Sequence, residues 1–280
     1  MGLLSGLAHF GLKDLENMEI YEEQDKADDG TKEKEAVKTV REEDFLFDKS
    51  YTCPVCGQKF KARTVKTGKA RLIGSDQDLR PRYEHIETLK YDVIMCPSCG
   101  YTALSRFFGV VTAQQAKNIK DVISANFICP TELKETYTYD EALERYQMAL
   151  ANAIVKKTKA SEKAYICLKT AWLLRSKAEH LQENLPDYEA QKKQCEDKEN
   201  EFLQSAMDGF VTAERSEGFP MCGLDQQTVD YLIAVTAVRF EKYDMASRLI
   251  MNILQSSTNQ RMKDRVRELK KIVLEKNKSS

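Results

Sequence analysis

Hydrophobic positions follow two different periods along this chain. From about Thr138 to the C-terminus, apolar side chains recur every three or four residues, which is typical of α-helices with one buried face. Between Phe45 and residue 110 they alternate in short runs, as in strands that bury one face. This second pattern predicts strands at residues 60–65, 71–74 and 91–95, the second returning after a turn at 66–69.

Three of the expected helices repeat one arrangement of side chains. A small residue is followed four positions later by a large apolar one, and three positions after that by another small or apolar one, all on one helix face. The repeats begin at positions 142, 206 and 246, which is 64 and then 40 residues apart, against about 34 in a regular tetratricopeptide array. We expect the extra length within the charged residues 179–200. The repeated positions are Ala142-Tyr146-Ala149, Ala206-Phe210-Ala213 and Ala246-Ile250-Ile253.

These patterns predict an α+β fold, with a small β domain followed by an α-helical tetratricopeptide-like repeat domain. The polar, acidic residues 21–44 bury too little apolar surface to offset the entropy of ordering, so they predict a disordered linker. The expected division is an N-terminal arm over 1–44, a ribbon-like domain over 45–110, a helical domain over 111–275 and a tail over 276–280.

The sharpest chemical signal is a pair of cysteine knuckles. Residues 53–57 read Cys-Pro-Val-Cys-Gly and residues 96–100 read Cys-Pro-Ser-Cys-Gly. Together Cys53, Cys56, Cys96 and Cys99 supply the four thiolates of a tetrahedral metal site. Each glycine can adopt a positive φ that turns backbone amides toward the sulfurs. The expected architecture is a zinc ribbon, although the 39 residues between Cys56 and Cys96 exceed a minimal ribbon and predict additional structure.

Four thiolates leave no open coordination position, which favours a structural zinc ion over a catalytic one. Rubredoxin-type iron is the rival interpretation, because rubredoxin also uses two Cys-Pro-x-Cys-Gly knuckles. Two matched knuckles argue against a redox enzyme, which needs one reactive pair near a helix N-terminus. The remaining cysteines are scattered and no secretory signal is visible, so a reducing cytoplasm is the expected location.

Charge is balanced overall but uneven along the chain. The net charge of −1 predicts no general attraction to nucleic acid or membranes, and no apolar run is long enough for a membrane span. Residues 57–90 nevertheless carry nine basic and four acidic side chains, whereas residues 12–44 carry six basic and thirteen acidic ones. The acidic arm could therefore lie over the basic insert, although a solvated arm is the simpler expectation.

The insert also contains the best candidate for a ligand site. One interpretation is internal: Asp78 and Arg80 cap turns and pair with each other or with the ribbon. The alternative is an anion or nucleic-acid contact, with Tyr83 available for stacking on a base. His85 is expected to be a surface or packing residue. The candidate contact residues are Asp76, Asp78, Arg80, Arg82, Tyr83, Lys66, Lys69 and Arg71.

The block that runs from the first knuckle through residues 66–69, 76–83 and 91–95 to the second knuckle is distinctive as a whole. It resembles an uncharacterised bacterial family, domain of unknown function 2225, and the resemblance extends from about Phe45 to the C-terminal helices. The resemblance implies a bacterial cytoplasmic protein with a metal-binding ribbon and a tetratricopeptide-like tail. It implies no activity.

Three classes of function therefore stay open. The first is a non-enzymatic, zinc-binding scaffold or adaptor whose helical surface binds a protein or peptide partner. The second is a nucleic-acid-binding protein that uses the ribbon and the basic insert. The third is an iron electron-transfer protein or an unrecognised enzyme. A deep pocket lined by Asp76, Asp78, Arg80, Arg82 and His85 would favour an enzyme.

Overall fold

The computed structural model describes residues 40–129, 135–184 and 186–279. One compact unit spans Val40–Ser280. Most of the expected N-terminal arm therefore lies outside the described residues. The last part of the expected linker is ordered: Glu42–Phe45 form a short 3-10 helix, η3, in which Glu42 accepts hydrogen bonds from Lys90 and Tyr91.

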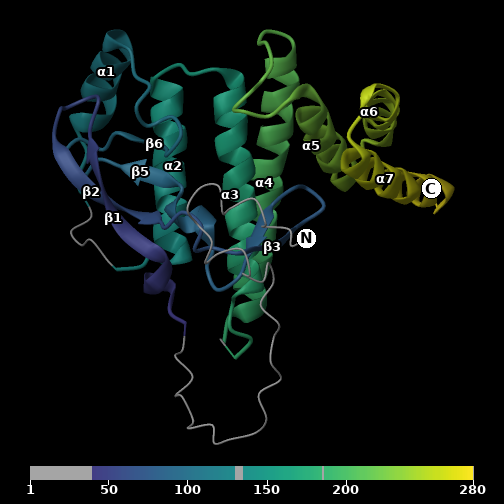
Figure 1. Ribbon diagram of the computed structural model, residues 1–280, viewed down its shortest axis with the longest axis horizontal. Helices are drawn as coiled ribbons and strands as arrows, with labels where there is room; N and C mark the ends of the chain where they lie inside the picture. The colour runs from purple at the N-terminus through teal and green to yellow at the C-terminus, as the bar shows by residue number, and fades with distance from the viewer. Residues whose placement is uncertain (1–39, 130–134, 185, 280) are drawn as a thin grey trace, which may run out of the picture. The chain divides into compact units, whose positions relative to one another are not determined.

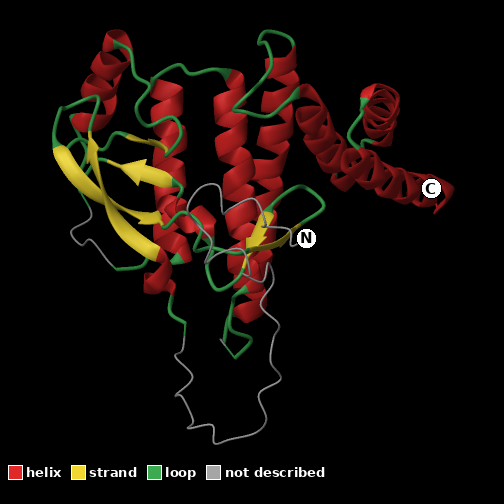
Figure 2. Cartoon of the chain, viewed as in Figure 1, coloured by secondary structure: helices red, strands yellow, loops and turns green. Residues whose placement is uncertain are grey.

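The strands form three separate two-stranded antiparallel sheets within the described residues (Figure 2). The expected strand at 60–65 is confirmed as β2, but its partner is β1, a polar strand that the hydrophobic pattern did not predict. The expected return strand at 71–74 forms β3, which pairs with β4, so its predicted pairing with β2 is wrong. The pairs are β1 (Leu46–Thr52) with β2 (Lys59–Val65), β3 (Leu72–Ser75) with β4 (Pro81–Tyr83), and β5 (Val93–Met95) with β6 (Thr102–Leu104).

Helices follow the strands, and α2, α3 and α4 lie side by side (Figure 1). Thr138 begins α2 with a capping box, in which its hydroxyl and the Glu141 side chain satisfy each other's backbone amides. No described helix is long and apolar enough to cross a membrane. Besides η3, the helices are the 3-10 helix η4 (Thr88–Tyr91), α1 (Ala113–Ile119), the π-helix η5 (Lys120–Ser124), α2 (Tyr139–Val155), α3 (Ala160–Glu179), α4 (Tyr188–Glu214), α5 (Gln226–Arg239), α6 (Tyr243–Ser256) and α7 (Gln260–Ser279).

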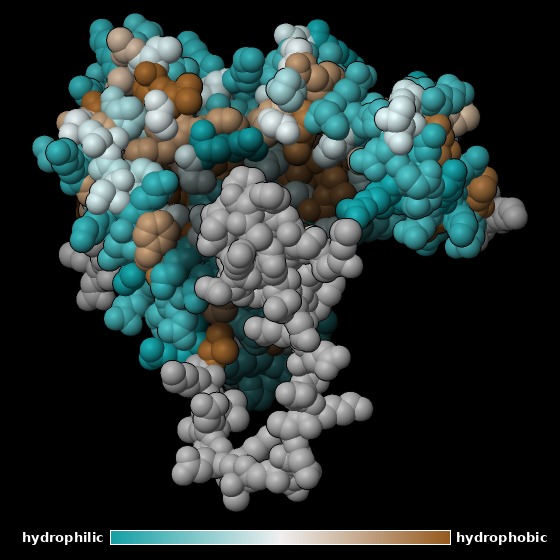
Figure 3. Space-filling model, viewed as in Figure 1, coloured by the Kyte–Doolittle hydropathy of each residue, from teal (hydrophilic) through white to brown (hydrophobic). Residues whose placement is uncertain are grey.

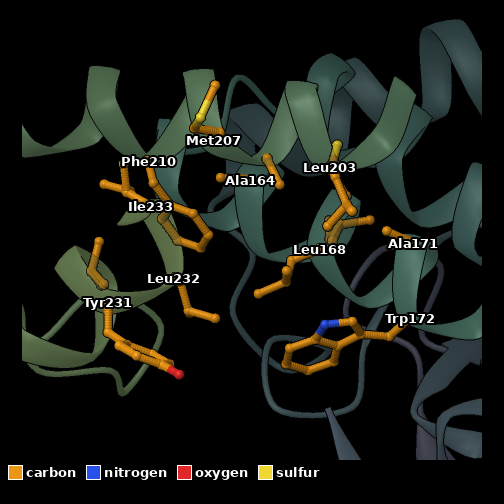
Figure 4. Packing of buried hydrophobic residues seen from close by; sticks show 14 of the residues in the cluster. Ala164, Leu168, Ala171, Trp172, Leu203, Met207, Phe210, Tyr231, Leu232 and Ile233 are labelled. Atoms are coloured by element: carbon orange, nitrogen blue, oxygen red, sulfur yellow. The ribbon is translucent and has the colours of Figure 1, made fainter. Parts of the chain in front are cut away.

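The repeated side-chain positions lie on α2, α4 and α6, and all of them are buried. The predicted helical faces are therefore confirmed. Gly209 lets α4 approach α3 closely, because a Cβ atom at this position would lie 2.9 Å from that of Ala164. Side chains of α3, α4 and α5 interlock in this region, with Trp172 and Leu168 near Leu232 (Figure 4). The added length before the second repeat is mostly the N-terminal part of α4.

The largest of three buried clusters joins part of the strand-containing region to the helices. Leu89, Val93 and Leu104, from the strand-containing part, belong to the same buried cluster as the helices. The fully buried Tyr146 of α2 donates a hydrogen bond to the Leu89 carbonyl at 3.1 Å. This shared core holds the second cysteine hairpin against α2, as a rigid support for the site described next.

Candidate metal centre

The two knuckles are the turns of two β-hairpins, and their cysteines converge. The first knuckle joins β1 to β2, and the second joins β5 to β6. All four Sγ atoms of Cys53, Cys56, Cys96 and Cys99 lie within 4.8 Å of one another. Sγ of Cys53 is 3.6 Å from Sγ of Cys99, and Sγ of Cys56 is 3.7 Å from Sγ of Cys96.

Both knuckles have the same backbone geometry. Gly57 and Gly100 have φ values of 76° and 72°, a left-handed conformation that disfavours other residues. Their amides donate to the carbonyls of Cys53 and Cys96 at 2.9 and 3.0 Å. This confirms the conformation that the sequence predicted for these glycines. The Cys-Pro-x-Cys-Gly motif therefore builds the same half-site twice.

The donor set fits a tetrahedral metal ion. Zn–S bonds of about 2.3 Å define a tetrahedron with edges of about 3.8 Å, close to the two shortest sulfur–sulfur distances. A disulfide would require about 2.05 Å, so these pairs are not bonded to each other. Four thiolates would complete the coordination of such an ion, and Cys53, Cys96 and Cys99 are buried. Such a centre stabilises structure and leaves no position for water or substrate.

Electrostatics in the cluster favour a bound cation. The hydrogen bond from the Cys99 thiol and the amides of Cys56 and Val55 lower the pKa of Cys53 to about 5. Burial raises the pKa of Cys96 to about 11, against the effect of amides in its own knuckle. Repulsion among neighbouring thiolates opposes full ionisation, and a divalent cation would remove that repulsion.

An aromatic cluster and α2 hold the two half-sites together. The rings of Tyr51 and Phe60 on the first hairpin pack with Phe108, which also contacts Tyr101 beside the second knuckle. The Asn152 side chain of α2 donates to the Gly100 carbonyl at 3.1 Å. The four-cysteine cluster is therefore linked both to the β-hairpins and to the first repeat helix.

A family model described as "Uncharacterized protein conserved in bacteria (DUF2225)" matches residues 46–273. The chain belongs to this family. The match includes both knuckles and nearly all of the helical part, which confirms the resemblance inferred from the motifs. No curated protein and no solved structure matches the DUF2225 chain.

The Asp76–Tyr83 segment is anchored to the helices, with Arg80 at its centre. The Arg80 side chain is 1% exposed. Its Nε donates to Asp76 at 2.6 Å, and its Nη2 donates to both carboxylate oxygens of Glu179 at 2.7 Å. Asp78 receives hydrogen bonds from both Nη atoms of Arg175 at 3.0 and 2.6 Å. The charged groups of this segment thus face partners on α3, which the sequence did not identify.

Further partners come from α3, α5 and α7. The Trp172 indole donates to Asp78 at 3.0 Å, the Tyr231 hydroxyl to the Gln77 carbonyl at 2.8 Å, and Arg265 to the Asp76 carbonyl at 3.2 Å. Trp172, Arg175 and Glu179 occupy one face of α3 at spacings of three and four. The position of Arg175 and Glu179 on the same helix face as Trp172 was the available signal, but nothing local indicated their partners.

The other candidate contact residues do not gather around Arg80. Lys66 donates to the Asp44 carbonyl, and Arg71, whose side chain is 79% exposed, lies 3.7 Å from Glu84. Lys69 is exposed in the same turn. Among the described residues, these three side chains and Arg80 therefore form no common anion site.

A cavity of about 500 Å³ lies beside this segment. Arg80, Arg82, Tyr83 and His85 line it, whereas Asp76 and Asp78 do not. Arg80 and Arg82 both donate to Glu179, and Arg82 also pairs with Asp76. Also in the lining, Ser176 pairs with Glu87, and Nδ1 of His180 lies 2.8 Å from the Ser176 carbonyl. The cavity matches only part of the set of residues expected for an enzyme.

Proposed function

We propose that this protein is a zinc-stabilised, non-enzymatic scaffold whose helical repeats bind a protein or peptide partner. The observation that supports this role is the complete set of four cysteine thiolates, three of them buried, which suits structure rather than catalysis. The second knuckle packs on α2, so the metal would rigidify the start of the repeat array. Helical repeats of this kind present extended surfaces to partners.

The metal itself is tested first. Purified protein, expressed with both zinc and iron available, should be colourless and contain one zinc per chain by elemental analysis. A red protein with iron at the same stoichiometry would instead support rubredoxin-like coordination and electron transfer. Protein that binds neither metal would contradict the proposed centre.

Partner binding is tested by photo-crosslinking in the native cell. The crosslinking amino acid is placed at Met251 on α6 or Leu274 on α7, whose side chains are 53% and 50% exposed. Lys61 on β2 serves as the matched ribbon position. We expect discrete protein adducts from the helical positions that survive nuclease treatment. Adducts only from Lys61, or none at any of these positions, would contradict the scaffold role.

The outer face of the first hairpin supports a second candidate function, nucleic-acid binding. In the β1–β2 register, Lys59 pairs with Thr52 and Lys61 with Ser50, while Tyr51 on the opposite face is half-buried. Lys59 and Lys61 are exposed, and alternate residues on a strand lie about 6.7 Å apart. A two-stranded ribbon of this kind fits a nucleic-acid groove.

Salt dependence tests this candidate. If Lys59 and Lys61 contact phosphates, replacing both with serine should make the slope of log K against log salt shallower by about 1.8. The matched control is Lys270→Ser on α7, an exposed lysine distant in sequence from the hairpin. Absence of binding to a mixed DNA and RNA pool at low salt would reject this function.

A further inference from the structure

A groove lined by side-chain amides lies where the N-terminal end of α5 meets the C-terminal end of α6. Its volume is about 840 Å³, and its walls include Gln226 and Gln227 of α5 with Asn252 and Gln255 of α6. None of these four side-chain amides has a hydrogen-bond partner in the part of the chain that the structure describes. The surface over α6 and α7 is predominantly hydrophilic on the face shown at the right of Figure 3.

Unpaired amides suit one kind of ligand in particular. Each offers an oxygen acceptor and two N–H donors. These groups are complementary to the N–H and C=O groups of an extended peptide backbone. The described lining contains no apolar residue that could anchor a ligand, so an amphipathic helix is a poor match. The lining therefore favours an extended segment bound through its backbone.

A buried carboxylate in the same groove indicates which kind of side chain a bound peptide would carry. Asp230 lines the groove although it is only 9% exposed. Asp230 is hydrogen-bonded to Glu214 of α4, whose Oε1 atom is buried without a hydrogen-bond partner. Burial, with the hydrogen bond to Asp230, raises the pKa of Glu214 to about 7, and burial also raises the pKa of Asp230.

This pair of acids has no basic partner within the described residues. No lysine, arginine or histidine there pairs with Asp230 or Glu214, and none lines the groove. A buried carboxylate without a counter-charge is costly, and it is relieved either by a proton or by a cation from outside. The acidic, amide-lined groove is thus complementary to a positively charged ligand.

We infer that this groove binds an extended peptide segment carrying a lysine or arginine, whose cation pairs with Asp230 while the surrounding amides hydrogen-bond the peptide backbone. This inference rests on the proposed role of the helices in protein binding, and it assigns the chemistry of the partner. A divalent cation is a poorer match, because only the four cysteines form a group of three or more metal-ligating side chains among the described residues.

The test uses the full-length, metal-loaded protein and fluorescent peptide pools with degenerate flanks. The central residue is fixed as arginine, lysine, norleucine or glutamate, and binding is followed by fluorescence anisotropy. We expect binding of the arginine or lysine pool at least about tenfold tighter than of the norleucine pool, as for a hydrogen-bonded charge pair. Equal binding of the cationic and norleucine pools overturns the inference.

Variants separate the roles of the groove. Asp230→Asn should remove most of the preference for cationic pools, whereas Asp121→Asn, an exposed acid on η5, should leave it unchanged. Asn252→Ala and Gln255→Ala should each weaken binding of every pool about fivefold, because they remove backbone contacts. Asp230→Asn removes a buried charge and keeps the shape of the side chain, so this variant should fold, which a melting curve checks.

Failure of this inference is distinguishable from failure of the scaffold role. If no pool binds while the photo-crosslinks from α6 and α7 persist, the partner uses another helical surface and the groove assignment is wrong. Tightening of all pools by added calcium or magnesium, lost in Asp230→Asn, would show that the carboxylates hold a metal instead. That result would also overturn the assignment of a peptide cation.

Discussion

Replacement of Arg80 by alanine tests whether the Asp76–Tyr83 segment is an internal anchor. The side chain is 1% exposed and neutralises Asp76 and Glu179 through bonds of 2.6 and 2.7 Å. Breaking a buried ion pair by removing one partner costs about 3–5 kcal/mol. Arg82 and Arg175 still contact these carboxylates in the variant, so we place the cost at about 3 kcal/mol.

The corresponding fall in melting temperature is about 6–12 °C, at about 2–4 °C per kcal/mol for a unit of this size. Thermal unfolding followed by circular dichroism measures it on metal-loaded protein, with metal content checked in each variant. Arg82→Ala should cost about 1 kcal/mol, because its side chain is 45% exposed and is screened by solvent. Arg71→Ala, with a 79% exposed side chain, should change stability by less than about 0.5 kcal/mol.

The loss of stability in Arg80→Ala should also depend on pH. Burial alone would raise the pKa of Asp76, but hydrogen bonds from Arg82 and Arg80 outweigh it and lower that pKa; the same balance lowers the pKa of Glu179. A carboxyl group whose pKa is lowered by folding stabilises the fold at pH values above its unfolded-state pKa of about 4. This stabilisation is lost as the pH falls through the folded-state pKa. The difference in melting temperature between wild type and Arg80→Ala should therefore become smaller below about pH 4. Equal melting temperatures for Arg80→Ala and Arg71→Ala at neutral pH would refute the reasoning.

Three further substitutions probe other parts of the molecule. Cys53→Ser should abolish stoichiometric zinc binding and expose the first hairpin to proteolysis, because metal affinity here is folding energy; retained zinc would contradict the centre. Glu214→Gln should raise the melting temperature at pH 8 more than at pH 5, since the stability linked to the raised Glu214 pKa is complete below about pH 4 and is lost as pH rises through about 7. Tyr146→Phe should cost about 1–2 kcal/mol in urea unfolding by leaving the Leu89 carbonyl unpaired, and an unchanged midpoint would show that this carbonyl finds another partner.

The cysteine centre was predictable because the spacing of each knuckle is a local property. Two residues between Cys53 and Cys56 let both sulfurs reach one ion, and Gly57 adopts the positive φ that this turn requires. The burial of Ala142 and Tyr146 was predictable for the same reason, since helical periodicity places them on one face before any tertiary contact forms.

The pairing of the strands was not predictable from periodicity. The residues of β1 are mostly polar and face solvent, so they show no hydrophobic alternation. Only the knuckle turn brings β1 beside β2. The strand at residues 71–74 was recognised, but its partner was decided by the anchoring of the following segment on the helices.

By itself, the sequence determined the metal-binding half-sites, the helical faces and the family, because each depends on residues close together along the chain. Only the tertiary structure decided what the charged residues do. Arg80 and Glu179 are 99 residues apart, and Asp230 meets Glu214 across two different helices. A charge in a sequence does not indicate whether its counter-charge is solvent, ligand or protein, since the packing of distant elements sets the partner and the local dielectric.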